Sequence, residues 1–131
     1  MNGLDTNVLV RYLTQDEPNQ ARKANALIDG AVGQGERLHI DVVVLCEVVW
    51  VLRGAYEFRK ESVADAVSRI LEAAQFSVED RDLLRLALDA YTSGQGDFAD
   101  YVLGQCNRRA GCDATATFDR ALRKSELFKL L

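Results

Sequence analysis

The sequence of 131 residues has few of the residues that define several common protein classes. Its three cysteines, Cys46, Cys106 and Cys112, are odd in number and form no C-x-x-C pair. This spacing argues against a disulfide framework and against zinc ligation, and it is typical of reduced thiols in the cytosol. The one histidine, His39, falls in a predicted strand, where a core or surface role is favoured and no Ser-His-Asp arrangement can be built.

Long apolar runs are also missing. The longest, from Val42 to Leu52, is too short to span a bilayer and contains Glu47. The first apolar residues are interrupted by Asp5, Asn7 and Arg11, which is unlike a secretory signal. We therefore expect a soluble intracellular protein with no membrane association.

The charge balance limits the possible partners. Lys and Arg total 16 against 20 Asp and Glu, for a net charge of -4. A bulk nucleic-acid binder is disfavoured, because local basic patches or bridging cations would have to offset phosphate repulsion. No glycine-rich phosphate loop of the Walker or dinucleotide type is present. The length and an apolar content of 48% predict one domain, residues 1–131, with a single core.

Hydrophobic periodicity predicts short strands separated by helices. Strands are expected just before Asp5 and at 37–40, 76–78 and 113–118. Helices are expected at 7–13, from an Asn19 cap to 28 or 32, and at 42–54, 62–74, about 80–91, 97–109 and 120–124. This order implies right-handed crossovers and an α/β fold: three αβα layers around a central parallel sheet of four or five short strands.

The segment 42–54 is ambiguous, because a continuous apolar run fits a buried strand or a buried helix. Its length, an N-cap at Asp41 and a stop at Gly54 favour a helix, whereas its many valines favour a sheet. If it is a helix, Glu47 lies among apolar neighbours. We expect this acid to be buried and therefore paired or metal-bound, since an unpaired buried charge costs several kcal/mol. The alternative is one solvent-facing acid on an amphipathic helix.

Further acids occur where ligands gather in parallel α/β sheets, beyond the carboxyl ends of strands. Asp5 and Asp119 each follow a predicted strand directly, although either could instead be an N-cap for the next helix. Asp97 and Asp100, at i and i+3, share one face of a first helical turn. Asp97 is the better cap and Asp100 the better ligand. A cluster of carboxylates without His or Cys suits Mg²⁺ or Mn²⁺.

Taken together, these motifs make the chain resemble a PIN-domain protein, specifically the toxin ribonuclease (VapC) of VapBC type II toxin–antitoxin systems. The resemblance covers essentially the whole chain. It rests on the order and separation of four motifs: Leu4-Asp5-Thr6-Asn7-Val8-Leu9, Leu45-Cys46-Glu47-Val48-Val49-Trp50, Asp97-Phe98-Ala99-Asp100, and Cys112-Asp113-Ala114 leading to Thr117-Phe118-Asp119-Arg120. Asp41 departs from the small hydroxyl residue that the family leads us to expect there.

The resemblance implies a site and a reaction. Asp5, Glu47, Asp100 and Asp119 would form an acidic pocket, with Asp97 as a candidate fifth member. The pocket would hold one or two Mg²⁺ or Mn²⁺ ions for endonucleolytic RNA cleavage that leaves a 5′-phosphate and a 3′-hydroxyl. Other residues would support the acids or guide the RNA backbone: Thr6, Asn7 and Thr117 in the first role, and Arg11, Arg53, Arg120 and Arg123 in the second.

The resemblance further implies a prokaryotic cytoplasmic protein that forms a homodimer and binds a separate VapB-like antitoxin. Two alternatives are weighed against it. A haloacid-dehalogenase-like phosphohydrolase also has an Asp after its first strand, but it usually has a second acid two residues later, where this chain has Asn7. A non-catalytic PIN-like binding module is disfavoured by the full set of acids, because clustered carboxylates repel one another without serving its role.

Overall fold

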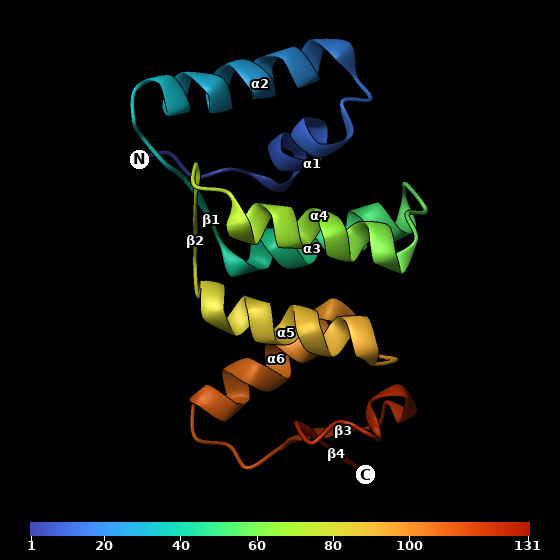
Figure 1. Ribbon diagram of the computed structural model, residues 1–131. Helices are drawn as coiled ribbons and strands as arrows, with labels where there is room; N and C mark the ends of the chain where they lie inside the picture. The colour runs from blue at the N-terminus through green and yellow to red at the C-terminus, as the bar shows by residue number, and fades with distance from the viewer. The chain divides into compact units, whose positions relative to one another are not determined.

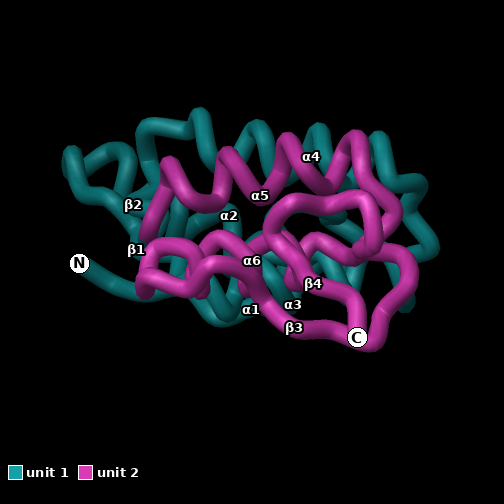
Figure 2. The backbone as a smooth tube through the Cα atoms, turned by 90° about the horizontal axis from the view of Figure 1, so that it is seen from below, with its two compact units in different colours: residues 1–79 teal, residues 80–131 magenta.

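The computed structural model describes residues 1–131 and has two compact units (Figure 2). Unit 1 comprises Met1–Glu79, and unit 2 comprises Asp80–Leu131. Figure 1 labels the elements of both. No helix is long and apolar enough to cross a membrane.

Unit 1 contains one pair of parallel strands, β1 (Leu38–Ile40) and β2 (Phe76–Val78). Their register sets Leu38 opposite Phe76 and Ile40 opposite Val78, and all four side chains are buried. The predicted first strand is reduced to a parallel bridge between Gly3 and His39, in which Leu4 N–H donates to the His39 carbonyl at 2.9 Å. Because Asp5 follows this bridge directly, it lies at the end of the chain's first extended segment.

Four helices complete unit 1: α1 (Thr6–Thr14), α2 (Pro18–Gly33), α3 (Val42–Gly54) and α4 (Lys60–Glu72). Helix α1 packs against α2 and α3, and α3 packs against α4. The predicted Asn19 cap of α2 is wrong. The Glu17 side chain caps this helix by accepting from the N–H groups of Asn19 and Gln20, and Pro18 occupies the first helical position, where its missing N–H is tolerated.

The valine-rich segment is helical, as its cap and length predict. The Asp41 side chain accepts a hydrogen bond from Val43 N–H at 2.8 Å, which satisfies one of the free donors of the first turn. The buried residues of α3 recur with helical spacing at Leu45, Val48, Val49 and Leu52. Burial of this stripe outweighs the preference of β-branched residues for strands, a preference that tertiary packing commonly overrides.

Unit 2 pairs two helices with a second pair of parallel strands. Helices α5 (Arg81–Ser93) and α6 (Phe98–Arg109) pack against each other, and the rings of Tyr91 and Phe98 meet edge to face with centroids 6.0 Å apart. Strand β3 (Thr115–Thr117) is followed by the 3₁₀ helix η1 (Arg120–Leu122) and by β4 (Phe128–Leu130), which pairs in parallel with β3.

A close approach fixes the turn between α5 and α6. Gly96 N–H donates to the Tyr101 hydroxyl at 3.0 Å, and a Cβ added at Gly94 would collide with the same hydroxyl and with the Ala90 carbonyl. Only a residue without a side chain fits at Gly94 without displacing its neighbours. The two glycines of the turn therefore lie directly against the Tyr101 hydroxyl of α6.

The α/β class and the parallel strands are confirmed, with a difference in the sheet. The sequence predicts one sheet of four or five strands, whereas the hydrogen bonds define two separate two-stranded sheets, β1–β2 in unit 1 and β3–β4 in unit 2. Strand β4 falls in the terminal piece 127–131, to which the sequence gives no assignment. With three residues, it is too short for periodicity to distinguish it from a loop.

Candidate functional site

The carboxylate of Asp5 is free to bind a ligand. Asp5 occupies the N-cap position of α1 with extended backbone angles, yet its side chain makes no capping hydrogen bond. Its side chain is exposed. The alternative that Asp5 serves only to cap the helix is therefore not supported, because the capping interaction that would explain it is absent.

The next residue, Thr6, has a buried hydroxyl without a hydrogen-bond partner. Thr6 is the only buried polar or charged residue of the chain, with 7% exposure, and its Oγ1 has no hydrogen-bond partner. A buried hydroxyl left unpaired costs about 1–3 kcal/mol. Such a cost is commonly retained where a bound ion, water or ligand completes the bonding. Asn7 is exposed and lines a cavity of about 320 Å³ with Arg11, Gln20 and Lys23.

Glu47 lies on the exposed face of α3, so the expectation that it is buried is wrong. The same face carries Val43 and Trp50, which are 62% and 79% exposed, one turn away on either side. The sequence argument failed because it took these apolar neighbours to be buried, whereas the burial stripe of α3 runs along a different side. Glu47 is thus a solvent-facing acid between two exposed apolar side chains, as the alternative of an amphipathic helix with one exposed acid predicts.

Unit 2 brings three of the predicted acids into electrostatic contact. Asp97 is at the N-cap position of α6, and Asp100 one turn later accepts a hydrogen bond from Asp97 N–H through Oδ2 at 3.0 Å. Burial raises the pKa of Asp100 above the usual value for an aspartate. The hydrogen bond from Asp97 lowers this pKa, and the negative charges of Asp97 and Asp119 raise it further.

Asp119 is held by its own cap and by Thr117. Its Oδ1 accepts from Ala121 N–H at 2.9 Å, and its backbone N–H donates to the Thr117 hydroxyl at 3.0 Å. Asp119 is therefore an N-cap of η1, as the alternative from the sequence allowed. Each of Asp100 and Asp119 uses one oxygen in such a bond, and the second oxygen makes no hydrogen bond.

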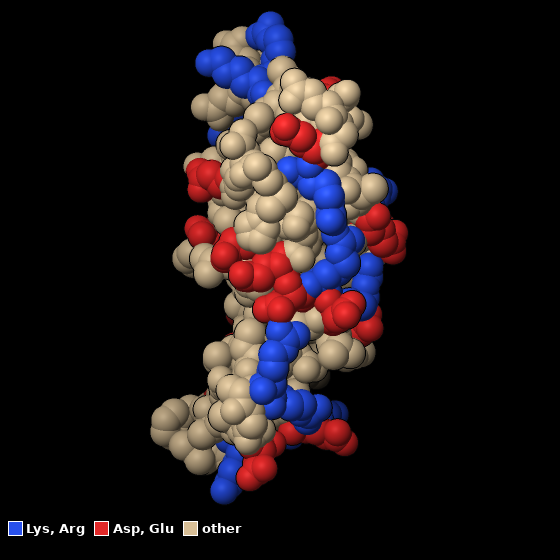
Figure 3. All heavy atoms as spheres, turned by 90° about the vertical axis from the view of Figure 1, so that its left-hand side faces the viewer, with Lys and Arg blue, Asp and Glu red and all other residues tan.

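The predicted basic residues differ in how freely they can move. Arg11 is tied down on several sides, since its guanidinium donates to Gln20 at 2.7 Å and to the Tyr56 hydroxyl at 2.7 Å and pairs with Asp16 at 3.3 Å. Arg53 donates to the Phe58 carbonyl, and Arg123 donates to the Arg120 carbonyl. Arg120 is exposed and makes no side-chain hydrogen bond. Figure 3 shows Lys and Arg side chains lying beside Asp and Glu side chains on the face that it draws.

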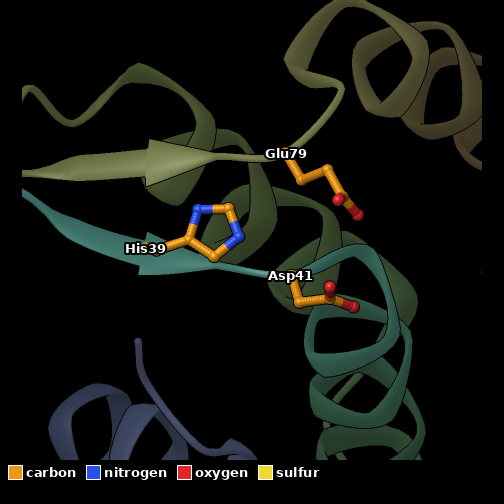
Figure 4. A group of neighbouring side chains, drawn as sticks. All are labelled: His39, Asp41 and Glu79. Atoms are coloured by element: carbon orange, nitrogen blue, oxygen red, sulfur yellow. The ribbon is translucent and has the colours of Figure 1, made fainter. Parts of the chain in front are cut away.

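One group of possible ligands was missed by the sequence argument. His39, Asp41 and Glu79 of unit 1 each offer a ligand atom, and these atoms lie within 4.8 Å of one another (Figure 4). The signal was present in the predicted strands: Asp41 and Glu79 each follow a strand directly, and His39 is two residues before Asp41. It was overlooked because His39 was assessed alone.

Each unit offers oxygen donors of the kind that suits Mg²⁺ or Mn²⁺. In unit 1, the carboxylates of Asp5 and Glu47 make no hydrogen bond and Thr6 has an unsatisfied hydroxyl. In unit 2, Asp100 and Asp119 each retain an oxygen. Hard divalent cations prefer such oxygen ligands.

Comparisons with known proteins agree with this chemistry. The model of the PIN domain family matches residues 4–126. The chain is 27% identical over 124 residues to a VapC ribonuclease of Aquifex aeolicus (strain VF5), covering 95% of this chain and 91% of that protein. No solved structure shows significant similarity. Since the family model spans almost the entire chain, including every predicted acid, the chain belongs to the PIN-domain family.

Proposed function

We propose that this protein is the toxin of a type II toxin–antitoxin pair and acts as an Mg²⁺- or Mn²⁺-dependent endoribonuclease. The observation that carries the proposal is the gathering of Asp97, Asp100 and Asp119 at one place in a PIN-domain chain. Burial, together with repulsion from the two neighbouring acids, disfavours the charged state of Asp100, a cost that a divalent cation would offset. The similarity to a VapC ribonuclease supports RNA as the substrate.

We assign the metal-binding role to Asp5, Glu47, Asp100 and Asp119. Asp97 serves mainly as the start of α6, where its N–H orients the Asp100 carboxylate, and it remains a candidate additional ligand. When bound, a divalent ion supplies a water of lowered pKa and neutralises charge on the phosphoryl oxygens. The ions also explain how a chain with a net charge of -4 accommodates a polyanion.

Three polar residues hold the acids in place in this proposal. Thr117 fixes the backbone of Asp119 through its hydroxyl. Thr6 directs its free hydroxyl toward a polar ligand that the chain itself does not supply, and Asn7 lines the neighbouring cavity. Residues that orient metal-binding groups in this way commonly change metal affinity or activity by about 10–100-fold when replaced.

We assign contacts with RNA phosphates to the four predicted arginines, which differ in how many of their donors are unengaged. Arg120 follows Asp119 directly and has a free guanidinium, so it is the best placed to contact an RNA backbone. Arg53 and Arg123 retain donors beyond their single carbonyl contacts. Arg11 has most of its donors engaged and contributes mainly to the shape of the cavity beside Asn7.

The partners in this proposal are RNA, a VapB-like antitoxin chain and a second copy of the protein. The similarity to a VapC ribonuclease supports the toxin–antitoxin context. An antitoxin would act by covering the acids or the arginines, because both sets are largely exposed on the isolated chain. Homodimer formation is tested by measuring the molar mass in solution without the antitoxin.

The decisive experiment incubates the purified protein with a mixed-sequence single-stranded RNA in Mg²⁺, in Mn²⁺ and in EDTA. We expect cleavage only with a divalent ion, with 5′-phosphate and 3′-hydroxyl ends. Asp5→Asn should lower the cleavage rate by about 100-fold, whereas Asp29→Asn, which changes an exposed acid of α2 by the same charge, should leave it unchanged. Full cleavage by Asp5→Asn would overturn the assignment. Hydrolysis of small phosphomonoesters without RNA cleavage would instead favour a phosphohydrolase.

A further inference from the structure

A second group of possible metal ligands lies where β1 and β2 end. The strands run in parallel with Ile40 opposite Val78, and Glu79 N–H donates to the Ile40 carbonyl at 3.0 Å. Asp41 and Glu79 are therefore the first residues beyond two neighbouring strand ends. Because side chains alternate along a strand, His39 projects from the same side of β1 as Asp41.

Figure 4 shows the imidazole of His39 beside the two carboxylates. One ligand atom from each residue lies within 4.8 Å of the other two. Ligand bonds to Zn²⁺ are about 2.0–2.2 Å long, so the donors of a tetrahedral site are about 3.4 Å apart. A contraction of up to about 1.4 Å would close the group around an ion. Glu79 is exposed, so its side chain can rotate without disturbing the core.

The three side chains are available as ligands. The imidazole of His39 makes no hydrogen bond within the chain. Asp41 accepts from Val43 N–H through Oδ1 at 2.8 Å, a bond that orients its carboxylate and leaves Oδ2 unengaged. Glu79 has only a long contact of 3.4 Å from Val42 N–H to Oε1. Hydrogen bonds of the Asp41 kind hold a ligand in a fixed orientation, which favours metal binding.

The local charge also favours a cation. The N-terminus of α3 contributes a partial positive charge of about half a unit, whereas the two carboxylates contribute two negative charges. Their sum is negative. The contact with Val42 N–H relates Glu79 to the start of α3, but capping does not explain the position of the unpaired imidazole.

We propose that His39, Asp41 and Glu79 bind one divalent transition-metal ion, with Zn²⁺ as the representative. One imidazole nitrogen and two carboxylate oxygens favour Zn²⁺, Co²⁺ or Mn²⁺ over Mg²⁺, which takes oxygen ligands almost exclusively. Three protein ligands leave a coordination position for water. The site differs in composition from the oxygen-only acids of the proposed nuclease centre, and it does not depend on the proposed function. None of the three cysteines belongs to the group.

The single histidine makes the test direct. In a full-length chain without a polyhistidine tag, the imidazole proton NMR signals belong to His39 alone. At neutral pH, we expect one equivalent of Zn²⁺ to shift these signals and the same concentration of Mg²⁺ to leave them unchanged. Calorimetry should show one Zn²⁺ bound per chain at this site, weakened more than about tenfold by Glu79→Gln.

Matched variants separate metal ligation from a structural effect. Asp41→Ser keeps a capping hydroxyl and loses the carboxylate, so it should weaken Zn²⁺ binding without lowering the melting temperature of the metal-free protein. Glu36→Gln, an exposed acid just before β1, should bind Zn²⁺ as the unmodified chain does. Asp5→Asn should also leave this binding unchanged. His39 signals that do not respond to millimolar Zn²⁺, or equal Zn²⁺ affinities for Glu79→Gln and the unmodified chain, would overturn the proposal.

Discussion

In unit 1 the acids assigned to the nuclease centre, Asp5 and Glu47, accept no hydrogen bond from the chain, whereas in unit 2 Asp100 and Asp119 each bind a backbone N–H. The acids of unit 2 therefore have two roles, since the same carboxylate that would bind a metal also starts a helix. Those of unit 1 are free of any such structural role. Replacing an acid of unit 1 should therefore lower the RNA cleavage rate without lowering the free energy of unfolding. Replacing an acid of unit 2 should change both.

The largest effect is expected from Glu47→Gln. Removing this exposed acid should lower the RNA cleavage rate by at least about 100-fold. Losses of this size follow when an enzyme loses a group that stabilises the charge developing in the transition state. The melting temperature should not fall, because the side chain has no partner to lose. Glu36→Gln is the matched control, as another exposed glutamate of unit 1 with no side-chain hydrogen bond. Equal loss of cleavage in both variants would show a general charge effect.

Asp119→Ala should reduce both cleavage and stability. It removes the acceptor of Ala121 N–H, and the loss of such a cap costs about 1 kcal/mol. Asp119→Asn retains an acceptor oxygen, so it should lose cleavage with little change in unfolding free energy. Asp5→Ala should behave like Asp119→Asn in stability, because Asp5 makes no capping bond. Urea unfolding of the three variants measures the contrast, and a destabilised Asp5→Ala would contradict it.

Thr6→Val tests the unpaired hydroxyl beside Asp5. The replacement has nearly the same shape and removes the buried Oγ1 that lacks a partner. We expect the metal-free protein to gain about 1 kcal/mol in unfolding free energy. Cleavage should fall, because the hydroxyl would no longer serve a bound ion or water. A loss of stability measured in EDTA would show that the hydroxyl has a partner in solution.

The burial of Asp100, with the repulsion from its neighbouring acids, predicts a pH-dependent gain in stability from Asp100→Asn. Because the pKa of Asp100 is raised above the usual value for an aspartate, the folded chain holds this proton to higher pH than the unfolded chain. The free energy of unfolding therefore falls as pH rises through that window, and the cost is fully present at neutral pH. In EDTA, Asp100→Asn should melt at a higher temperature than the unmodified chain at pH 7. The difference should shrink below pH 3.8, and a constant difference would contradict this cause.

The sequence predicted the elements of both units better than it predicted the environment of the acids. Strand β2 was predicted with its observed bounds, and α3 was resolved as a helix because the Asp41 cap and the Gly54 stop are local signals. The burial of Glu47 was predicted wrongly. Which side of a uniformly apolar helix faces the core depends on its packing partners, which a run of valines does not encode.

The supporting interactions of the acids were also only partly visible in the sequence. The i, i+3 spacing of Asp97 and Asp100 indicated a shared face, but not that Asp100 turns back to the Asp97 N–H. The group of His39, Asp41 and Glu79 depends on the register of β1 against β2. Since 38 residues lie between Ile40 and Glu79 in the sequence but their backbones share a hydrogen bond, only the strand pairing brings these side chains together.

The central claim is that Asp5 and Asp119 are both needed in the proposed RNA cleavage, and a double-mutant cycle on the cleavage rate tests it most directly. The rates of Asp5→Asn, Asp119→Asn and the double variant are compared with that of the unmodified chain. Residues that act as a unit are strongly non-additive, so the account predicts that the double variant is no slower than the slower single variant. Losses that multiply in the double variant would contradict the account, because they would show that the two acids act independently.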